Sequence, residues 1–223
     1  MKYSCFGHFY KNNLVTCRSV LLISKKPLEE ISSYDLVAVM MNPGSSVPLE
    51  TDIKDITATY PTENISDLVP TKPDDTQFQI MEVMSRNNLS TACIINLSDV
   101  RDADSSKFIS SINKLEHSIL GNAHSIFSVT RKMELKKILK QSCNCPVIIA
   151  SGVNYKLRFL TNNAVNHFKP DLLIGNKKEN GLYYHALPRL LEDRVKWVNE
   201  ISHQLERKLS IVNRARKNDT RLG

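Results

Sequence analysis

The residues with the clearest chemical potential follow an apolar run of strand length. Asn42 opens an Asn42-Pro43-Gly44 turn directly after the apolar residues 36–41. Proline cannot continue a strand ladder and biases the residue before it toward an extended backbone, whereas glycine permits a positive φ. The Asn42 side chain is therefore expected at the carboxyl end of a buried strand. Open α/β sheets bind their ligands at that end.

A hydrolytic site could be assembled from this turn, two aspartates and a late histidine. Breaking an N-glycosidic bond develops positive charge on the sugar and negative charge on the departing base, so it needs a held water and a hydrogen-bond donor. Asn42, Asp52 or Asp55 could hold or activate the water. His185 could donate to the base. Each residue alone also has an ordinary interpretation, as a structural turn, a loop carboxylate, a helix cap or a non-catalytic histidine.

Apolar periodicity along the chain predicts strands that alternate with helices. Strands are expected at residues 19–24, 36–41, 91–96, 124–130, 146–152 and 172–175. Helices are expected at residues 75–85, 108–120, 131–141 and 155–168 and from about residue 190 onward. Asp75 is expected to cap the first helix, and residues 2–13 are expected to be irregular. The alternation predicts a three-layer α/β/α fold with a central, mainly parallel sheet.

Length and composition favour one domain that includes residues 1–223. The chain is 41% hydrophobic, enough for a sizeable core. The polar, proline-bearing residues 60–77 are expected to form a long surface loop, and a long helix with a basic tail is expected to close the domain from about residue 190. A formal charge of +7 favours an anionic partner such as nucleic acid. No apolar run approaches the roughly 20 residues of a membrane span.

The five cysteines indicate a reduced, cytoplasmic protein. Cys143 and Cys145 are close in sequence, but no second close pair accompanies them. Scattered thiols are therefore expected, and no metal or cofactor is expected.

Four short motifs, taken in order, resemble those of the uracil-DNA glycosylase superfamily. They are Asn42-Pro43-Gly44, a strand ending in Asn96, a strand ending in Ala150-Ser151-Gly152, and His185-Ala186-Leu187-Pro188. The mismatch-specific branch carries Asn-Pro-Gly after its first core strand, and the late superfamily motif is His-Pro-Ser-Pro. The chain is also similar to a family of uncharacterised bacterial proteins with an Asn-Pro-Ser turn, a following Asp-x-Thr and a strand ending in Asn-Leu. The corresponding residues here are Asn42-Pro43-Gly44, Asp55-Ile56-Thr57 and Asn96-Leu97.

The resemblance implies roles for individual residues. Asn42 would hold the attacking water, Gly44 would let the backbone approach the target nucleotide, and His185 would hydrogen-bond the departing base. Leu187 could fill the gap left by a flipped base. Arg189 could contact a phosphate in place of the usual clamp.

Binding residues are expected around these positions. The substrate-binding set comprises Pro43, Gly44, Ser45, Ser46, Asn96 and Gly152. Asn96 is also expected to tie adjacent loops together through hydrogen bonds. Phosphate contacts with DNA are expected from Arg189 and from two basic segments that contain Lys132, Lys136, Arg214, Arg216 and Lys217.

The resulting hypothesis is a DNA glycosylase that acts on a modified base. Uracil-selective members of the superfamily place a tyrosine soon after the first motif, where Ser45, Ser46 and Val47 stand here. An open, hydroxyl-lined wall would admit a bulky polar group, such as glucosylated hydroxymethylcytosine in some phage genomes, which suggests antiphage defence. Uracil or mismatch repair, hydrolysis of free nucleotides or nucleosides, and an inactive nucleic-acid-binding module stay open as alternatives.

Overall fold

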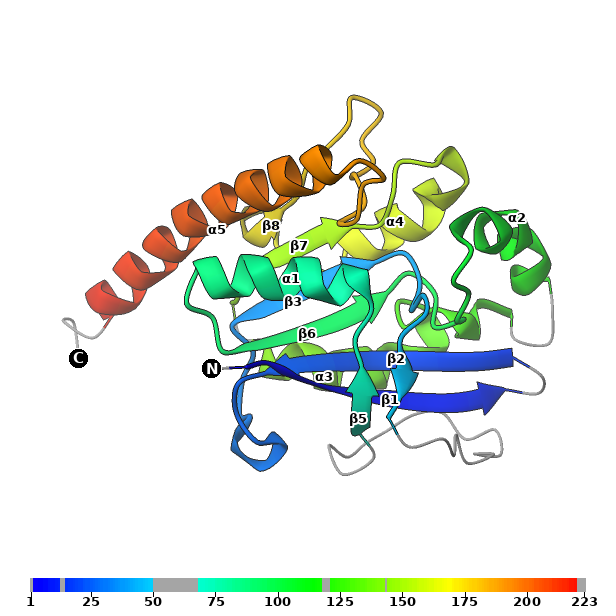
Figure 1. Cartoon of the computed structure of the whole chain (residues 1–223), viewed down its shortest axis with the longest axis horizontal. Helices are drawn as coiled ribbons and strands as arrows, with labels where there is room; N and C mark the ends of the chain where they lie inside the picture. The colour runs from blue at the N-terminus through cyan, green and yellow to red at the C-terminus, as the bar shows by residue number, and fades with distance from the viewer. Residues whose placement is uncertain (1, 13–14, 50–67, 118–120, 143, 220–223) are drawn as a thin grey trace.

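The computed structural model describes residues 2–12, 15–49, 68–117, 121–142 and 144–219, and for residues 12 and 211–219 it describes the backbone alone (Figure 1). Its strands are β1 (Ser4–Asn12), β2 (Val15–Ser24), β3 (Leu36–Met40), β4 (Val47–Pro48), β5 (Val69–Lys72), β6 (Thr91–Asn96), β7 (Val147–Ala150) and β8 (Leu173–Ile174). Its α-helices are α1 (Asp75–Arg86), α2 (Ser105–Glu116), α3 (Lys132–Gln141), α4 (Arg158–Val165) and α5 (Leu191–Asp219). Short 3-10 turns are η1 (Leu28–Glu30), η3 (Gly121–His124), η4 (Val129–Arg131), η5 (Tyr155–Leu157) and η6 (Pro170–Leu172).

The described strands form one mixed sheet in the order β4-β5-β1-β2-β6-β3-β7-β8. Neighbours from β6 to β8 are parallel, whereas β4, β5, β1 and β2 extend the sheet by antiparallel pairing. Every residue of β3, β6 and β7 is buried. A strand covered on both faces needs apolar residues at successive positions, which explains the continuous apolar runs in the sequence.

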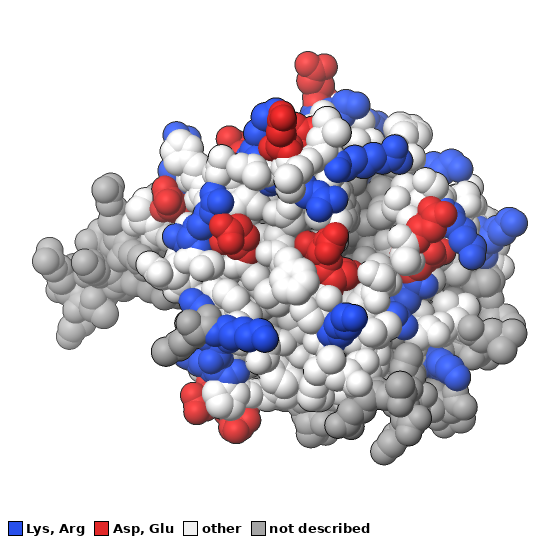
Figure 2. All heavy atoms as spheres, in the orientation of Figure 1, with Lys and Arg blue, Asp and Glu red and all other residues white. Residues whose placement is uncertain are grey.

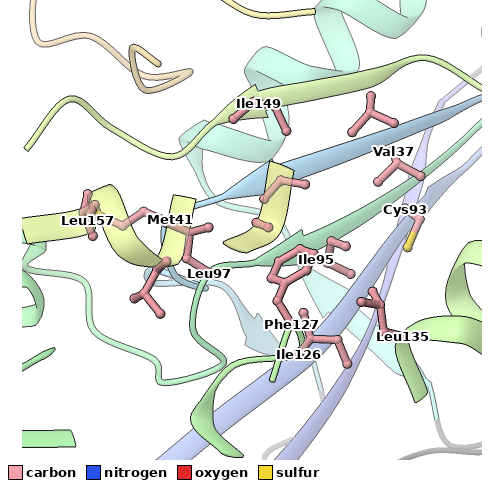
Figure 3. Packing of buried hydrophobic residues seen from close by; sticks show 14 of the residues in the cluster. Val37, Met41, Cys93, Ile95, Leu97, Ile126, Phe127, Leu135, Ile149 and Leu157 are labelled. Atoms are coloured by element: carbon pink, nitrogen blue, oxygen red, sulfur yellow. The ribbon is translucent and has the colours of Figure 1, made fainter. Parts of the chain in front are cut away.

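Helices cover both faces of this sheet, which confirms the predicted α/β class with three layers. On one face, α1 and α5 pack Ile80 and Trp197 against apolar residues of the central strands. On the other face lie α2, α3 and α4. Figure 3 shows part of this second core, where Ile126, Phe127 and Leu135 lie next to Ile95.

The connections reverse direction beside β3. The connection from β3 to β6 passes through α1 on one face, and the connection from β6 to β7 passes through α2 and α3 on the other and returns across β3. Loops at such a switch point leave the carboxyl ends of adjacent strands in opposite directions and open a crevice between them.

Three predictions about local structure are wrong. Residues 4–12 form β1, which is paired along its length with β2, although they were expected to be irregular. Residues 124–130 form bends and the ends of two 3-10 turns and not a strand, because Ile126 and Phe127 pack into the core on the α2 side of the sheet and do not join the sheet. Residues 69–72 of the expected surface loop form β5, which pairs with β1.

The cap of α1 is one residue earlier than predicted. The Oδ1 atom of Asp74 accepts from the backbone N–H groups of Thr76 (2.9 Å) and Gln77 (3.3 Å). The Gln77 side chain accepts in turn from the Asp74 backbone N–H at 2.6 Å. This reciprocal capping box fixes the start of α1 at the carboxyl edge of the sheet.

Candidate active-site cleft

A cleft of about 780 Å³ opens at the carboxyl ends of β3, β6 and β7. Its walls come from the turn after β3, the start of α1, the segment after β6, the turn after β7 and the segment before α5. Eight of the residues singled out in the sequence line it, namely Asn42, Gly44, Ser45, Asn96, Gly152, His185, Leu187 and Arg189. The structure therefore brings Asn42 and His185 to the same end of the sheet.

Asn42 is held so that one polar atom is left for a ligand. Its Nδ2 donates to the backbone carbonyls of Asp102 at 2.8 Å and Val100 at 3.4 Å. No described residue donates to its Oδ1. Because an amide oxygen accepts hydrogen bonds, Asn42 can hold a water molecule within the cleft.

His185 is a neutral hydrogen-bond donor in this cleft. Its Nδ1 accepts from the backbone N–H of Leu187 at 3.1 Å. In the neutral ring the proton therefore resides on Nε2. Burial lowers the pKa of His185, and the nearby Asp74 carboxylate opposes this shift only in part. At neutral pH the ring can donate through Nε2 without carrying a charge.

Asn96 is fully enclosed, with 0% of its surface exposed, at the end of β6. Neither Oδ1 nor Nδ2 has a hydrogen-bond partner among the described residues. The prediction that Asn96 ties adjacent loops together is therefore wrong. Buried amides are normally paired, so the unpaired Asn96 side chain is an exception at the end of β6.

Asp74 is a cleft carboxylate that the sequence analysis missed. Its Oδ1 accepts the hydrogen bonds of the helix cap, whereas no described residue donates a hydrogen bond to its Oδ2. Gly44 has a φ of +62°, and a Cβ added to it would lie 2.9 Å from Oδ2 of Asp74. Only glycine at this turn combines the left-handed backbone with so close an approach. The signal in the sequence was the acidic pair Asp74 and Asp75 before an apolar helix.

Arg18 is a second missed residue that lines the cleft. Only 1% of its surface is exposed, and its Nε and Nη1 atoms have no partner among the described residues. Burial lowers its pKa to about 10, which leaves the guanidinium charged at neutral pH. The signal in the sequence was a single arginine inside an apolar strand, where an unpaired charge is costly.

Two of the expected substrate contacts lie behind the cleft wall. Pro43 and Ser46 are both buried, and the Ser46 backbone carbonyl accepts from the Arg101 guanidinium at 2.7 Å. These two residues support the turn. Asp52 and Asp55 lie outside the described residues.

The other expected DNA contacts lie away from the cleft. Lys132 and Lys136 are exposed on α3, which covers the sheet face opposite α1. The last turns of α5, with Arg214, Arg216 and Lys217, extend past the end of the sheet where β3 begins (Figure 1). On the face shown in Figure 2, basic and acidic side chains are interspersed and form no continuous basic field.

Arg131 lies in a buried network of ion pairs, although its position in a basic segment suggested a contact with DNA. Its guanidinium contacts Asp99 at 2.5 Å and Glu134 at 2.7 Å, and all three side chains are buried. The hydroxyl of Tyr10 donates to Asp99 at 2.8 Å. This network anchors the start of α3 beneath the end of β6.

No known family, curated protein or solved structure matches this chain. The resemblance to the glycosylase superfamily therefore stays a prediction. The described residues contain no group of three or more His, Cys, Asp or Glu side chains arranged to hold a metal ion. Within the same residues, no helix has the length and apolar character to cross a membrane. Cys5, Cys17 and Cys93 are buried thiols that form no disulfide.

Proposed function

We propose that the cleft hydrolyses the N-glycosidic bond of a nucleobase that has been turned out of DNA, leaving an abasic site. One observation carries the proposal. Asn42, whose amide oxygen is available to hold water, and His185, whose neutral ring has an Nε2–H donor, both line the same cleft. Hydrolysis of this bond requires that combination of groups.

Residues that line the cleft can supply each step of this hydrolysis. A water accepted by Asn42 attacks C1′ of the sugar and gives its proton to the free Oδ2 of Asp74. The C1′–N bond breaks, and its electron pair leaves with the base. His185 donates a hydrogen bond through Nε2 to the base as negative charge develops there. The carboxylate of Asp74 also stabilises the positive charge on the sugar before the new C–O bond is complete.

The shape of the cleft favours a base with a substituent. Its volume of about 780 Å³ lies within the usual range for small-molecule sites. No described Phe, Tyr or Trp lines it, and Ser45 and Val47 stand after the turn. A bulky polar group on the base can therefore be accommodated. Glucosylated hydroxymethylcytosine in phage DNA is one such base, which supports a role in antiphage defence.

The rim offers a few contacts for DNA. Arg189 and Lys72 can neutralise phosphates, and Leu187 can occupy the space left in the helix by the extruded base. Turning a base out of the stack costs a few kcal/mol, which contacts inside the pocket must offset.

The test is a search for abasic sites. DNAs that contain uracil, mismatched thymine, hydroxymethylcytosine or its glucosylated form are incubated with the full chain and cleaved with alkali. Asn42→Ala and His185→Ala should lose base release while still unfolding in one cooperative transition. Asn166→Ala and His203→Ala, which alter exposed residues outside the cleft, are matched controls and should keep it. Full activity in both cleft variants would refute the assigned roles.

A second candidate, hydrolysis of free nucleosides or nucleotides, is favoured by one observation. Asp75 and Asp102 line the cleft beside its basic residues, and such carboxylates oppose approach of a phosphate backbone. Affinity for DNA that is weak and indifferent to salt, together with cleavage of nucleosides, would support this candidate.

A further inference from the structure

The turn that carries Asn42 lies outside the sheet. Residues 42–46 follow β3 and precede the two-residue strand β4, which pairs with β5 and not with a neighbour of β3. Backbone outside a strand ladder has no strand partner to fix it, so other hydrogen bonds must hold it in place. The location of the Asn42 amide therefore depends on the contacts of this turn.

Three hydrogen bonds join the turn to the segment after β6. Nδ2 of Asn42 donates to the backbone carbonyls of Val100 and Asp102. From the residue between these two, the Arg101 guanidinium donates through Nη2 to the Ser46 carbonyl at 2.7 Å. Both ends of the turn are therefore tied to three consecutive residues of one segment.

The two carbonyls that Asn42 contacts also decide which way its amide faces. A backbone carbonyl only accepts hydrogen bonds, so it pairs with the NH2 group of the amide and would be repelled by Oδ1. The amide is therefore oriented with Oδ1 away from residues 100–102. If the turn shifted relative to this segment, Asn42 would lose that orientation.

The segment after β6 is itself fixed to β2. The pairing of β2 with β1 shifts between His8 and Phe9, so β2 contains an extra residue. On the N-terminal side of this bulge, residues 16–18 bond to residues 99–101 through backbone hydrogen bonds of 2.8 and 3.0 Å. The segment therefore extends the sheet and gives the turn a rigid support.

Arg101 provides this support from behind the cleft wall. It is half-buried and is not among the residues that line the cleft. Its guanidinium carbon lies 5.4 Å from the centroid of the Phe9 ring, which holds the side chain in place. A hydrogen bond from a charged donor is stronger than one between neutral groups. Arg101 can therefore hold Ser46 firmly without contacting a substrate.

We infer that Arg101 is a positioning residue for the proposed hydrolysis. By holding Ser46, it keeps the turn in place against residues 100–102, so that Asn42 presents its oxygen to the water. The effect on catalysis rests on the proposed function, whereas the orientation of the amide does not. Displacing a catalytic group by about 1 Å can slow a reaction by about a hundredfold.

The test compares Arg101→Met with a matched control, Arg158→Met. Nη2 of Arg158 likewise donates to a backbone carbonyl, that of Asn180 at 2.9 Å, and its guanidinium lies 4.9 Å from the centroid of the Tyr155 ring. These contacts do not involve the turn after β3. Both variants remove a guanidinium and retain a side chain of similar volume.

The first measurement is the rate of base release in a single turnover, with the DNA that the parent protein cleaves fastest. Arg101→Met should lower this rate by between about tenfold and about a hundredfold while leaving the affinity for the same DNA unchanged. Arg101→Lys retains a charged donor and should recover part of the rate. Arg158→Met should keep the rate of the parent.

The second measurement uses nuclear magnetic resonance and requires no reaction. The side-chain NH2 signal of Asn42 is identified as the one that Asn42→Ala removes. In the parent protein its hydrogens should exchange with water more slowly than those of the exposed Asn166. Arg101→Met should lose this protection, and Arg158→Met should retain it. If Arg101→Met does not fold, Arg101→Lys serves in both measurements, with smaller changes in the same direction.

Several results would overturn the inference. One is equal exchange of the Asn42 and Asn166 amides in the parent protein, a comparison that needs no variant. Another is a rate of release or an Asn42 exchange that the change at Arg101 leaves unaltered. A loss of affinity as large as the loss of rate would also overturn it, because Arg101 would then contact the DNA. If no DNA yields abasic sites, the proposed function is overturned and the Asn42 exchange alone decides the inference.

Discussion

Replacing Gly44 by alanine tests whether the turn after β3 and the cap of α1 act as one unit. The substitution puts a side chain at a φ of +62° and places its Cβ 2.9 Å from Oδ2 of Asp74. The left-handed backbone costs a non-glycine residue about 1 kcal/mol, and a displaced N-cap costs about 1 kcal/mol more. We therefore expect Gly44→Ala to lower the free energy of unfolding by about 2 kcal/mol.

Gly181 provides the matched control. Its φ is +86°, and a Cβ added there would meet no atom within 4 Å. Gly181→Ala should therefore show only the backbone cost, about 1 kcal/mol. Both values follow from urea unfolding, where the shift in midpoint at constant slope gives the change in stability.

A double-mutant cycle then isolates the contact with Asp74. Serine retains capping ability with a shorter side chain, so Asp74→Ser should relieve the crowding. In that background Gly44→Ala should cost about 1 kcal/mol, as at Gly181. The same cost in both backgrounds would refute the reasoning, because the turn and the cap would then be independent.

Further predictions concern the buried network, the histidines and the rim. Asp99→Asn should lower the free energy of unfolding by about 3 kcal/mol, because Arg131 would lose its buried carboxylate partner; an unchanged urea midpoint would contradict this. The contribution of His124 to the free energy of unfolding should fall by up to about 3 kcal/mol between pH 6.5 and 4, because burial lowers the pKa of His124 from 6.5 to about 4 and the unfolded chain binds the proton first. The same dependence of the free energy of unfolding on pH in His124→Asn would exclude this cause. Base release should persist below pH 6.5, since burial lowers the pKa of His185 and keeps it a neutral donor; an activity loss centred at pH 6.5 with intact fold would argue against that role. Arg189→Glu should weaken binding to DNA of any sequence and reduce its salt dependence, and unaltered binding would remove Arg189 from the interface.

The parallel half of the fold could be predicted because its buried strands appear in the sequence as continuous apolar runs. Residues 91–96 are buried at every position, so β6 has a continuous apolar sequence with a polar residue at its end. The same pattern located β3 and β7 and hence the edge where Asn42, Asn96 and Gly152 meet.

The antiparallel half could not be predicted in the same way. The extra residue in β2 interrupts the alternation of faces, since Cys17 and Leu22 pack in the same core although they are five positions apart. Strict alternation from Leu22 would put Arg18, and not Cys17, in that core. The location of Arg18 in the cleft depends on this tertiary feature. The prediction of a strand from His124 to Thr130 was wrong because its β-branched and aromatic residues suit a strand, whereas Ile126 and Phe127 pack as part of a turn against one face of the sheet.

The buried thiols of the N-terminal hairpin have a practical consequence. Burial raises the pKa of Cys5 in β1 and of Cys17 in β2 to about 12, so both thiols stay protonated and shielded at neutral pH. Only the thiolate reacts with disulfide reagents, so labelling of these residues requires that the hairpin first opens. The rate of labelling then reports local unfolding of the strand that holds Arg18, and a ligand bound in the cleft would slow it.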